Sequence, residues 1–168
     1  AKLMNLTLTA ADLSGVNLVG TDLTSSNLTS VNMQNTDLSG ATMLETTIVF
    51  ANMSNAKLVN VDLSGHDMEG INFTNADFTD ANLQNADLSG ATIQGNTFTN
   101  AKLMNLTLTA SDLSGVNLTG ANITNSDFTD ANLQNADLSG ATIQGNTFTN
   151  AKLMNLTLTA ADLSGVNL

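Results

Sequence analysis

The stretch ADFTDANLQNADLSGATIQG, residues 76–95, divides into four segments of five residues: ADFTD, ANLQN, ADLSG and ATIQG. An α-helix places every third or fourth residue on one face and a strand every second, so a period of five fits neither as a straight element. Counted from Ala1, the same division runs through all 168 residues without an insertion. We number the residues of each segment as positions 1 to 5 of a repeat.

Each position of the repeat has its own chemistry. Position 3 is apolar in all 34 repeats, with 21 Leu, 5 Phe, 4 Ile and 4 Met, while position 1 is mostly small and position 2 is always Asp, Asn, Thr or Lys. The alternation over positions 1 to 3 predicts a short extended segment with positions 1 and 3 inside. Positions 4 and 5, rich in Ser, Thr, Gly and Asn, predict a turn. A fixed period of this kind indicates a solenoid.

The commonest repeat identifies a family. ADLSG begins at residues 11, 86, 136 and 161, and TDLSG, VDLSG and SDLSG begin at residues 36, 61 and 111. These repeats resemble the A(D/N)LXX motif of the pentapeptide-repeat family, over the whole chain. The resemblance implies an all-β fold, a right-handed quadrilateral β-helix with four repeats per coil and about eight coils. Residue i should then stack on residue i+20, and we expect no capping segments.

A longer period lies above the five-residue repeat. Residues 74–118 and 124–168 are nearly identical, and residues 1–18 are repeated at 151–168. We therefore predict one solenoid domain over residues 1–168, built from units of about 1–50, 51–100, 101–150 and 151–168. Fifty residues make two and a half coils, so successive units present the same side chains on opposite sides. Pairs such as Thr7/Thr9 and Thr97/Thr99 should therefore face opposite ways, whereas an ice-binding surface needs one side repeated in every coil.

The composition excludes several functions. A net charge of −11, four lysines and no arginine argue against binding to nucleic acids or anionic membranes. No apolar run is long enough for membrane insertion, and there is no cysteine. The single histidine, His66, has no second ligand for zinc, and Asn96 and Asn146 are expected to form hydrogen bonds within a corner or a stack. We expect no enzyme, no catalytic residues, no cofactor and no metal site.

One segment departs from its counterparts on the outside of the predicted coil. Residues 41–50 read ATMLETTIVF, whereas residues 91–100 and 141–150 read ATIQGNTFTN. Outward polar residues are thereby replaced by Leu44, Val49 and Phe50. Exposed apolar clusters can mark contact sites, so these three residues are a candidate protein-contact patch, with sequence drift as the alternative explanation.

Three functions fit these features. The first is a structural, self-assembling solenoid, a filament or surface-array segment that associates end to end or laterally. The family resemblance implies the second, a DNA mimic that binds DNA gyrase and protects it from quinolones, which agrees with a rod of charge −11. The third is ice binding. A surface rich in Asn and Thr and free of Cys favours an extracellular or cell-surface location over the cytoplasm.

Overall fold

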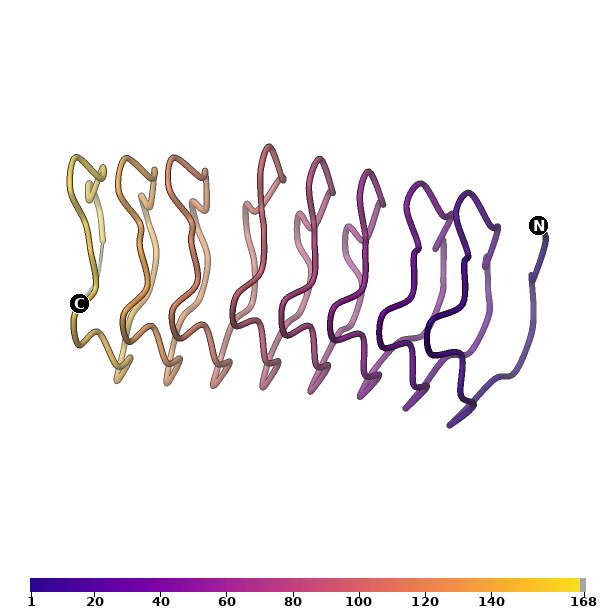
Figure 1. Cartoon of the computed structure of the whole chain (residues 1–168). Coiled ribbons are helices and arrows are strands. Elements are labelled where there is room, and N and C mark those ends of the chain that lie inside the picture. Colours follow the sequence, from indigo (N-terminus) through magenta and orange to yellow (C-terminus); the bar gives the residue numbers. More distant parts are fainter. Residues whose placement is uncertain (167–168) are drawn as a thin grey trace.

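The chain forms one continuous stack of coils, with its two ends at opposite ends of a rod (Figure 1). The structure, a computed structural model, describes residues 1–166. It contains no helix and no strand longer than one residue over this range, because each extended segment makes its bridge only at position 2, from Lys2 to Asp162. Every bridge is parallel and joins residues 20 apart, such as Lys2 to Asp22 and Thr142 to Asp162. The predicted register is therefore confirmed.

Four repeats complete each coil, which gives the solenoid four sides. We call side 1 the repeats that begin at residues 1, 21, 41 and so on, and sides 2, 3 and 4 those that begin at residues 6, 11 and 16 and at steps of 20 from them. At the usual distance of about 4.8 Å between paired strands, eight coils make a rod about 40 Å long. Sides 1 and 3 are opposite each other, as are sides 2 and 4.

Backbone hydrogen bonds join each coil to the next in a regular pattern. The amide at position 3 donates to the carbonyl of position 2 in the following coil, as from Leu23 to Thr42 at 2.8 Å. The amide at position 2 donates to position 1 of the preceding coil, as from Asn52 to Val31 at 2.9 Å. The corner closes on itself, because position 1 donates to position 3 of the repeat before it, as from Ala11 to Leu8 at 2.9 Å.

The corners depend on an unusual backbone conformation. Every position 5 in the described chain has a positive φ, from 56° to 70°. Glycine and asparagine tolerate this region best, and they fill most of these positions. The predicted turns at positions 4 and 5 are thereby confirmed, and their sequence preference follows from the backbone.

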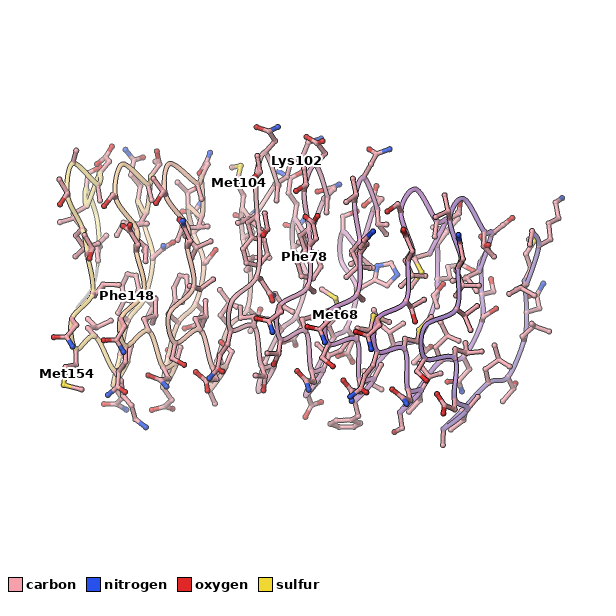
Figure 2. All side chains as sticks on the ribbon, in the orientation of Figure 1. Met68, Phe78, Lys102, Met104, Phe148 and Met154 are labelled. Carbon is pink, nitrogen blue, oxygen red and sulfur yellow. The ribbon has the colours of Figure 1, made fainter. Side chains whose placement is uncertain are left out.

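The core is a set of axial columns built by positions 1 and 3. Phe73, Phe78 and Phe128 are among the largest fully buried side chains, and Figure 2 shows Phe78 and Met68 inside the coils. Phe78 stacks on Phe98 with ring centroids 5.2 Å apart, and Phe128 on Phe148 at 4.9 Å. Burial of each large apolar side chain contributes about 1.5–3 kcal/mol, so these columns drive the coiling of an otherwise polar chain.

Candidate functional site

Position 2 holds the corner of its own repeat. Its Asp or Asn Oδ1 accepts the amide of position 4, as in Ser139 to Asp137 at 2.9 Å and Val19 to Asn17 at 3.0 Å. Where position 4 is Ser or Thr, its hydroxyl often donates to the same oxygen, as Ser139 Oγ does at 2.6 Å. This bond explains why position 2 favours Asp and Asn.

These bonds change the acidity of the carboxylates. The Ser139 hydroxyl, followed by the Ser139 amide, lowers the pKa of Asp137 from its ordinary value of 3.8. The pKa values of five further aspartates are lowered for the same kind of reason: Asp12, Asp22, Asp37, Asp62 and Asp162. The aspartates are thus structural acceptors that stay ionised, which does not suit a general acid.

The charged stacks are only partly paired. Lys57 Nζ lies 3.7 Å from Asp37 Oδ2, and this is the one ion pair within 4.0 Å in residues 1–166. Lys57 also forms a bridge with Asp77, so it lies between two aspartates as predicted, but it pairs with only one. Asp67 stacks directly on Asp87.

The ladder between coils is interrupted at two places. Among the described residues, four expected bridges are absent: Thr42 to Asp62, Thr47 to Asp67, Thr97 to Asn117 and Lys102 to Asn122. Each interruption opens a cleft. The first, of about 370 Å³, is lined by residues 40–44 together with Asn60, Asp62, Ser64 and His66. The second, of about 460 Å³, lies between residues 96–101 and 117–122, and the coils are visibly wider apart there (Figure 1).

His66 lies at the first interruption. Its Nε2 is 2.8 Å from the carbonyl oxygen of Met43, 23 residues earlier, so this nitrogen carries the proton and donates it. Thr46 Oγ1 makes the equivalent bond to Leu23 O at 3.1 Å with a much smaller group. The imidazole thus fills the space between coils and prevents the bridge from Thr47 to Asp67. The structure agrees with the prediction of a histidine at the edge of the core.

Asn96 lies at the second interruption and is 3% exposed. Its Oδ1 accepts the amide of Ala76 at 3.0 Å, and Asn146 Oδ1 accepts that of Ser126 at 2.8 Å. The prediction that both form hydrogen bonds within a stack is therefore confirmed. The Nδ2 atoms of both residues are buried without a partner in residues 1–166.

A common feature connects the two interruptions. In each, two bulky residues stack at position 1: Thr46 with His66, and Asn96 with Val116. Elsewhere a large residue usually stacks on alanine, as Val31 does on Ala51, and that ladder is intact. The pair of Val16 and Thr36 also keeps its bridge, but the bond from Asp37 N to Val16 O is stretched to 3.2 Å. Both interruptions thus coincide with a stack of two bulky residues at position 1, although stacks such as Leu106 on Ser126 keep their bridge.

The predicted contact patch is exposed. Leu44 is 61% exposed and Phe50 is 55% exposed, while Val49 is half-buried. Leu44 borders the first cleft on side 1, and Val49 and Phe50 lie on side 2. The ring of Phe50 covers Gly70 in the next coil, where an added Cβ would lie 2.5 Å from Phe50 Cδ1. Leu44 lies at the corner between sides 1 and 2, whereas Val49 and Phe50 lie at the next corner, between sides 2 and 3, so the three residues do not form one flat surface.

Other ligand sites are not evident in the described chain. No three His, Cys, Asp or Glu side chains within residues 1–166 are close enough to hold a metal ion together. Over the same residues no helix is long and apolar enough to span a bilayer.

Comparison with known proteins agrees with this architecture. A family model described as pentapeptide repeats matches residues 7–43, 45–75 and 71–109, in eight copies. A second, described as a pentapeptide repeat region, matches residues 91–168. The chain belongs to the pentapeptide-repeat family. None of the curated proteins matches it in sequence.

Two solved structures show the relationship of this pentapeptide-repeat protein to others. HetL, a pentapeptide-repeat protein involved in heterocyst differentiation regulation in the cyanobacterium Nostoc sp. PCC 7120, is 28% identical, with a TM-score of 0.51 over 99% of this chain and 84% of HetL. A trypsin-treated variant of QnrB1, a plasmid-mediated fluoroquinolone resistance protein, is 19% identical, with a TM-score of 0.56 over 100% of this chain and 89% of the QnrB1 chain. Together with the repeats, these neighbours place the chain among right-handed quadrilateral β-helices.

The distribution of threonines in this pentapeptide-repeat protein follows the 50-residue unit. Thr7/Thr9, Thr107/Thr109 and Thr147/Thr149 lie on side 2, whereas Thr97/Thr99 and Thr157/Thr159 lie on side 4. Asp67, Asp87 and Asp127 interrupt the threonine column on side 2. The pairs are thus divided between two opposite sides, as predicted.

Proposed function

We propose that this chain is a non-catalytic structural solenoid that associates with further copies of itself. The observation that supports this proposal is the uniformity of the contact between coils. Outside the two interruptions, each coil in residues 1–166 offers the same backbone N–H and C=O groups to its neighbours.

Inside the rod the same groups pair with each other. Position 3 amides of one coil bond position 2 carbonyls of the next, as Leu138 N does to Thr157 O at 2.8 Å. Two copies joined head to tail would repeat this pattern, and unpaired strand edges are ready templates for such pairing. A head-to-tail contact along the axis of the rod adds each copy beyond the last and forms no ring, so association would continue into a filament.

Electron microscopy of the purified chain at rising concentration, with mass measured in parallel, tests this function. Unbranched rods are expected. Because copies with a net charge of −11 repel each other, added salt should promote them. A Thr7→Pro substitution removes a backbone N–H from the edge of the first coil, and an edge is the place where a sheet tolerates proline. The substitution should therefore shorten the rods without loss of the folded monomer. Monodisperse monomers at all concentrations and salt levels would contradict the proposal.

An uneven charge distribution favours a second candidate, a DNA-mimic module that binds a protein such as DNA gyrase. Side 2 carries Asp67, Glu69, Asp87, Asp127 and Asp130, and no lysine lies on this side within residues 1–166. A stripe of carboxylates along a rod imitates the phosphates of a duplex. A supercoiling assay with gyrase and a quinolone tests this candidate, because a mimic should restore supercoiling and an inert rod should not.

A further inference from the structure

The surface around residues 44–50 combines exposed apolar side chains, an open cleft and carboxylates. We propose that this surface, on a chain with the proposed non-catalytic function, binds a basic peptide segment in which arginine or lysine alternates with apolar residues. We call it the corner site, and define it by Leu44, Val49 and Phe50, the first cleft, and the carboxylates Glu45, Asp62, Asp67 and Glu69.

The backbone of the corner site is less favourable than that of its counterparts. Glu45 and Phe50 both have positive φ, of 56° and 57°. The corresponding residues of the other units are Gly95 and Gly145, and Asn100 and Asn150, which adopt this region at less cost. The coil imposes the same conformation at every position 5, including Ala10 and Ser25, so it reflects the corner and does not by itself mark a site. Phe50 combines this backbone conformation with an exposed aromatic side chain, where its counterparts have asparagine.

Apolar anchoring comes from side chains at the two corners that flank side 2. Leu44 and Phe50 are each more than half exposed, at 61% and 55%. The Phe50 ring is fixed against Gly70, and only a residue without a Cβ leaves room for it there. An aromatic ring held in place offers contact area with little loss of side-chain entropy on binding, which is typical of interface anchors.

The cleft supplies acceptors for a cation. Because the ladder is open, the carbonyl of Asp62, a residue that borders the cleft, accepts no backbone hydrogen bond within residues 1–166. The Asp62 carboxylate borders the same cleft, and its pKa is lowered by the hydroxyl and amide of Ser64, so it is ionised. A guanidinium or ammonium group has several donors for such oxygens and no acceptor.

The surrounding charge selects the same partner. Residues 41–50 and 60–70 contain Glu45, Asp62, Asp67 and Glu69 and no lysine. Asp67 and Glu69 lie on side 2, next to the repeat that carries Val49 and Phe50. A basic segment would therefore be attracted to the site, and its apolar residues would cover Leu44 and Phe50.

Three fluorescent peptides and two variants test the corner site. The peptides are an alternating Arg/Leu peptide, one with Ser in place of Leu, and one with Glu in place of Arg. The first variant, Leu44→Gln, Val49→Thr and Phe50→Asn, carries the residues found at positions 94, 99 and 100, so it keeps the net charge and fits the fold. The second is Asp67→Asn with Glu69→Gln. Binding is followed by fluorescence anisotropy at low and physiological salt.

The Arg/Leu peptide should bind the unmodified chain, and the first variant should weaken this binding at least about tenfold. The second variant should also weaken binding and reduce its dependence on salt. Equal binding to the first variant would overturn the proposal, because general attraction to an acidic chain would then suffice. Equal binding of the Ser peptide, or any preference for the Glu peptide, would also overturn it.

A second copy of the chain is the competing occupant. Measurement of the mass in solution distinguishes the two occupants. If the unmodified chain forms dimers and the first variant does not, the corner site binds a second copy, and the proposal is overturned. The first variant leaves both edges of the solenoid unchanged. If this variant still forms filaments but no longer binds the peptide, the corner site is independent of self-association. The proposed function and the proposed peptide site can therefore fail separately.

Discussion

His66 stacks on Thr46 at position 1, where most stacks in the chain include an alanine. Its imidazole reaches the Met43 carbonyl and thereby occupies the gap between two coils. One side-chain hydrogen bond is gained, while the backbone bonds of the Thr42/Asp62 and Thr47/Asp67 bridges are lost. A net contribution of about 0.5–1.5 kcal/mol for each hydrogen bond makes the exchange unfavourable for stability.

A His66→Ala substitution should therefore stabilise the protein, in contrast to most changes at half-buried positions. We expect the free energy of unfolding in urea to rise by about 1 kcal/mol, because the coils can close and re-form the ladder. Thr46→Ala relieves the same crowding from the other side and should act in the same direction. A loss of stability in both variants would show that crowding is not the cause of the interruption.

Hydrogen bonds from Ser139 lower the pKa of Asp137. The Ser139 hydroxyl is the largest cause of the lowered pKa of that carboxylate, ahead of the Ser139 amide. A Ser139→Ala substitution should raise the Asp137 pKa toward 3.8, since the largest cause of the lowering is removed and only the residue-139 amide and the Thr119 side chain still lower it. Titration of the carboxyl carbon by NMR measures the change. Ser54→Ala, beside Asn52 rather than an aspartate, is the control and should leave Asp137 unchanged.

At the scale of the repeat, the interruptions divide the ladder into segments of different local stability. The amides of Met43 and Ile48 at the first interruption, and of Phe98 and Leu103 at the second, have no backbone acceptor within residues 1–166. On the same sides, Leu63 N bonds Asn82 O and Phe78 N bonds Thr97 O, both at 2.8 Å.

Hydrogen exchange should distinguish these two groups of amides. We expect the four unpaired amides to exchange at least about tenfold faster than those of Leu63 and Phe78, because they need no ladder opening. In the His66→Ala variant, protection should return at Met43 and Ile48 but not at Phe98 and Leu103. Uniform protection of all six amides in the unmodified chain would contradict the interrupted ladder.

Much of the fold could be predicted from the sequence because the five-residue period has no insertion. That period fixes which residues face inward, where the corners lie and which residues stack 20 apart. The interruptions were not predicted, since they depend on the combined volume of pairs such as Asn96 and Val116. Neither was the bond from position 2 to position 4, although the abundance of Asp and Asn before Ser and Thr was its signal. The contact patch at Leu44, Val49 and Phe50 stays a prediction.

At the scale of the whole molecule, two and a half coils per unit give the rod an approximate twofold screw symmetry. Identical segments, residues 1–18 and 151–168, begin on sides 1 and 3. A partner that recognised such a segment would therefore meet it on opposite sides of the rod. This arrangement suits lateral contacts in two directions better than a single flat binding surface.

The lowered aspartate pKa values also have a consequence for the whole rod. Six aspartates accept hydrogen bonds that hold their pKa values below 3.8 in the folded chain. A group whose pKa is lower in the folded state stabilises the fold above its unfolded pKa, and this contribution is lost as the pH falls through the folded value. The urea midpoint should therefore fall as the pH decreases below about 4.

A variant with asparagine at these six positions isolates this contribution. Asparagine already occupies position 2 in many repeats, and Asn17 Oδ1 accepts the amide of Val19 just as Asp137 accepts that of Ser139. At acid pH the variant and the unmodified chain carry the same charges, because the aspartates are then neutral. The urea midpoint of the variant should fall less steeply below about pH 4 than that of the unmodified chain. Parallel curves for the two proteins would mean that other groups cause the acid sensitivity. The charge of the six aspartates would then make no difference to the stability of the fold.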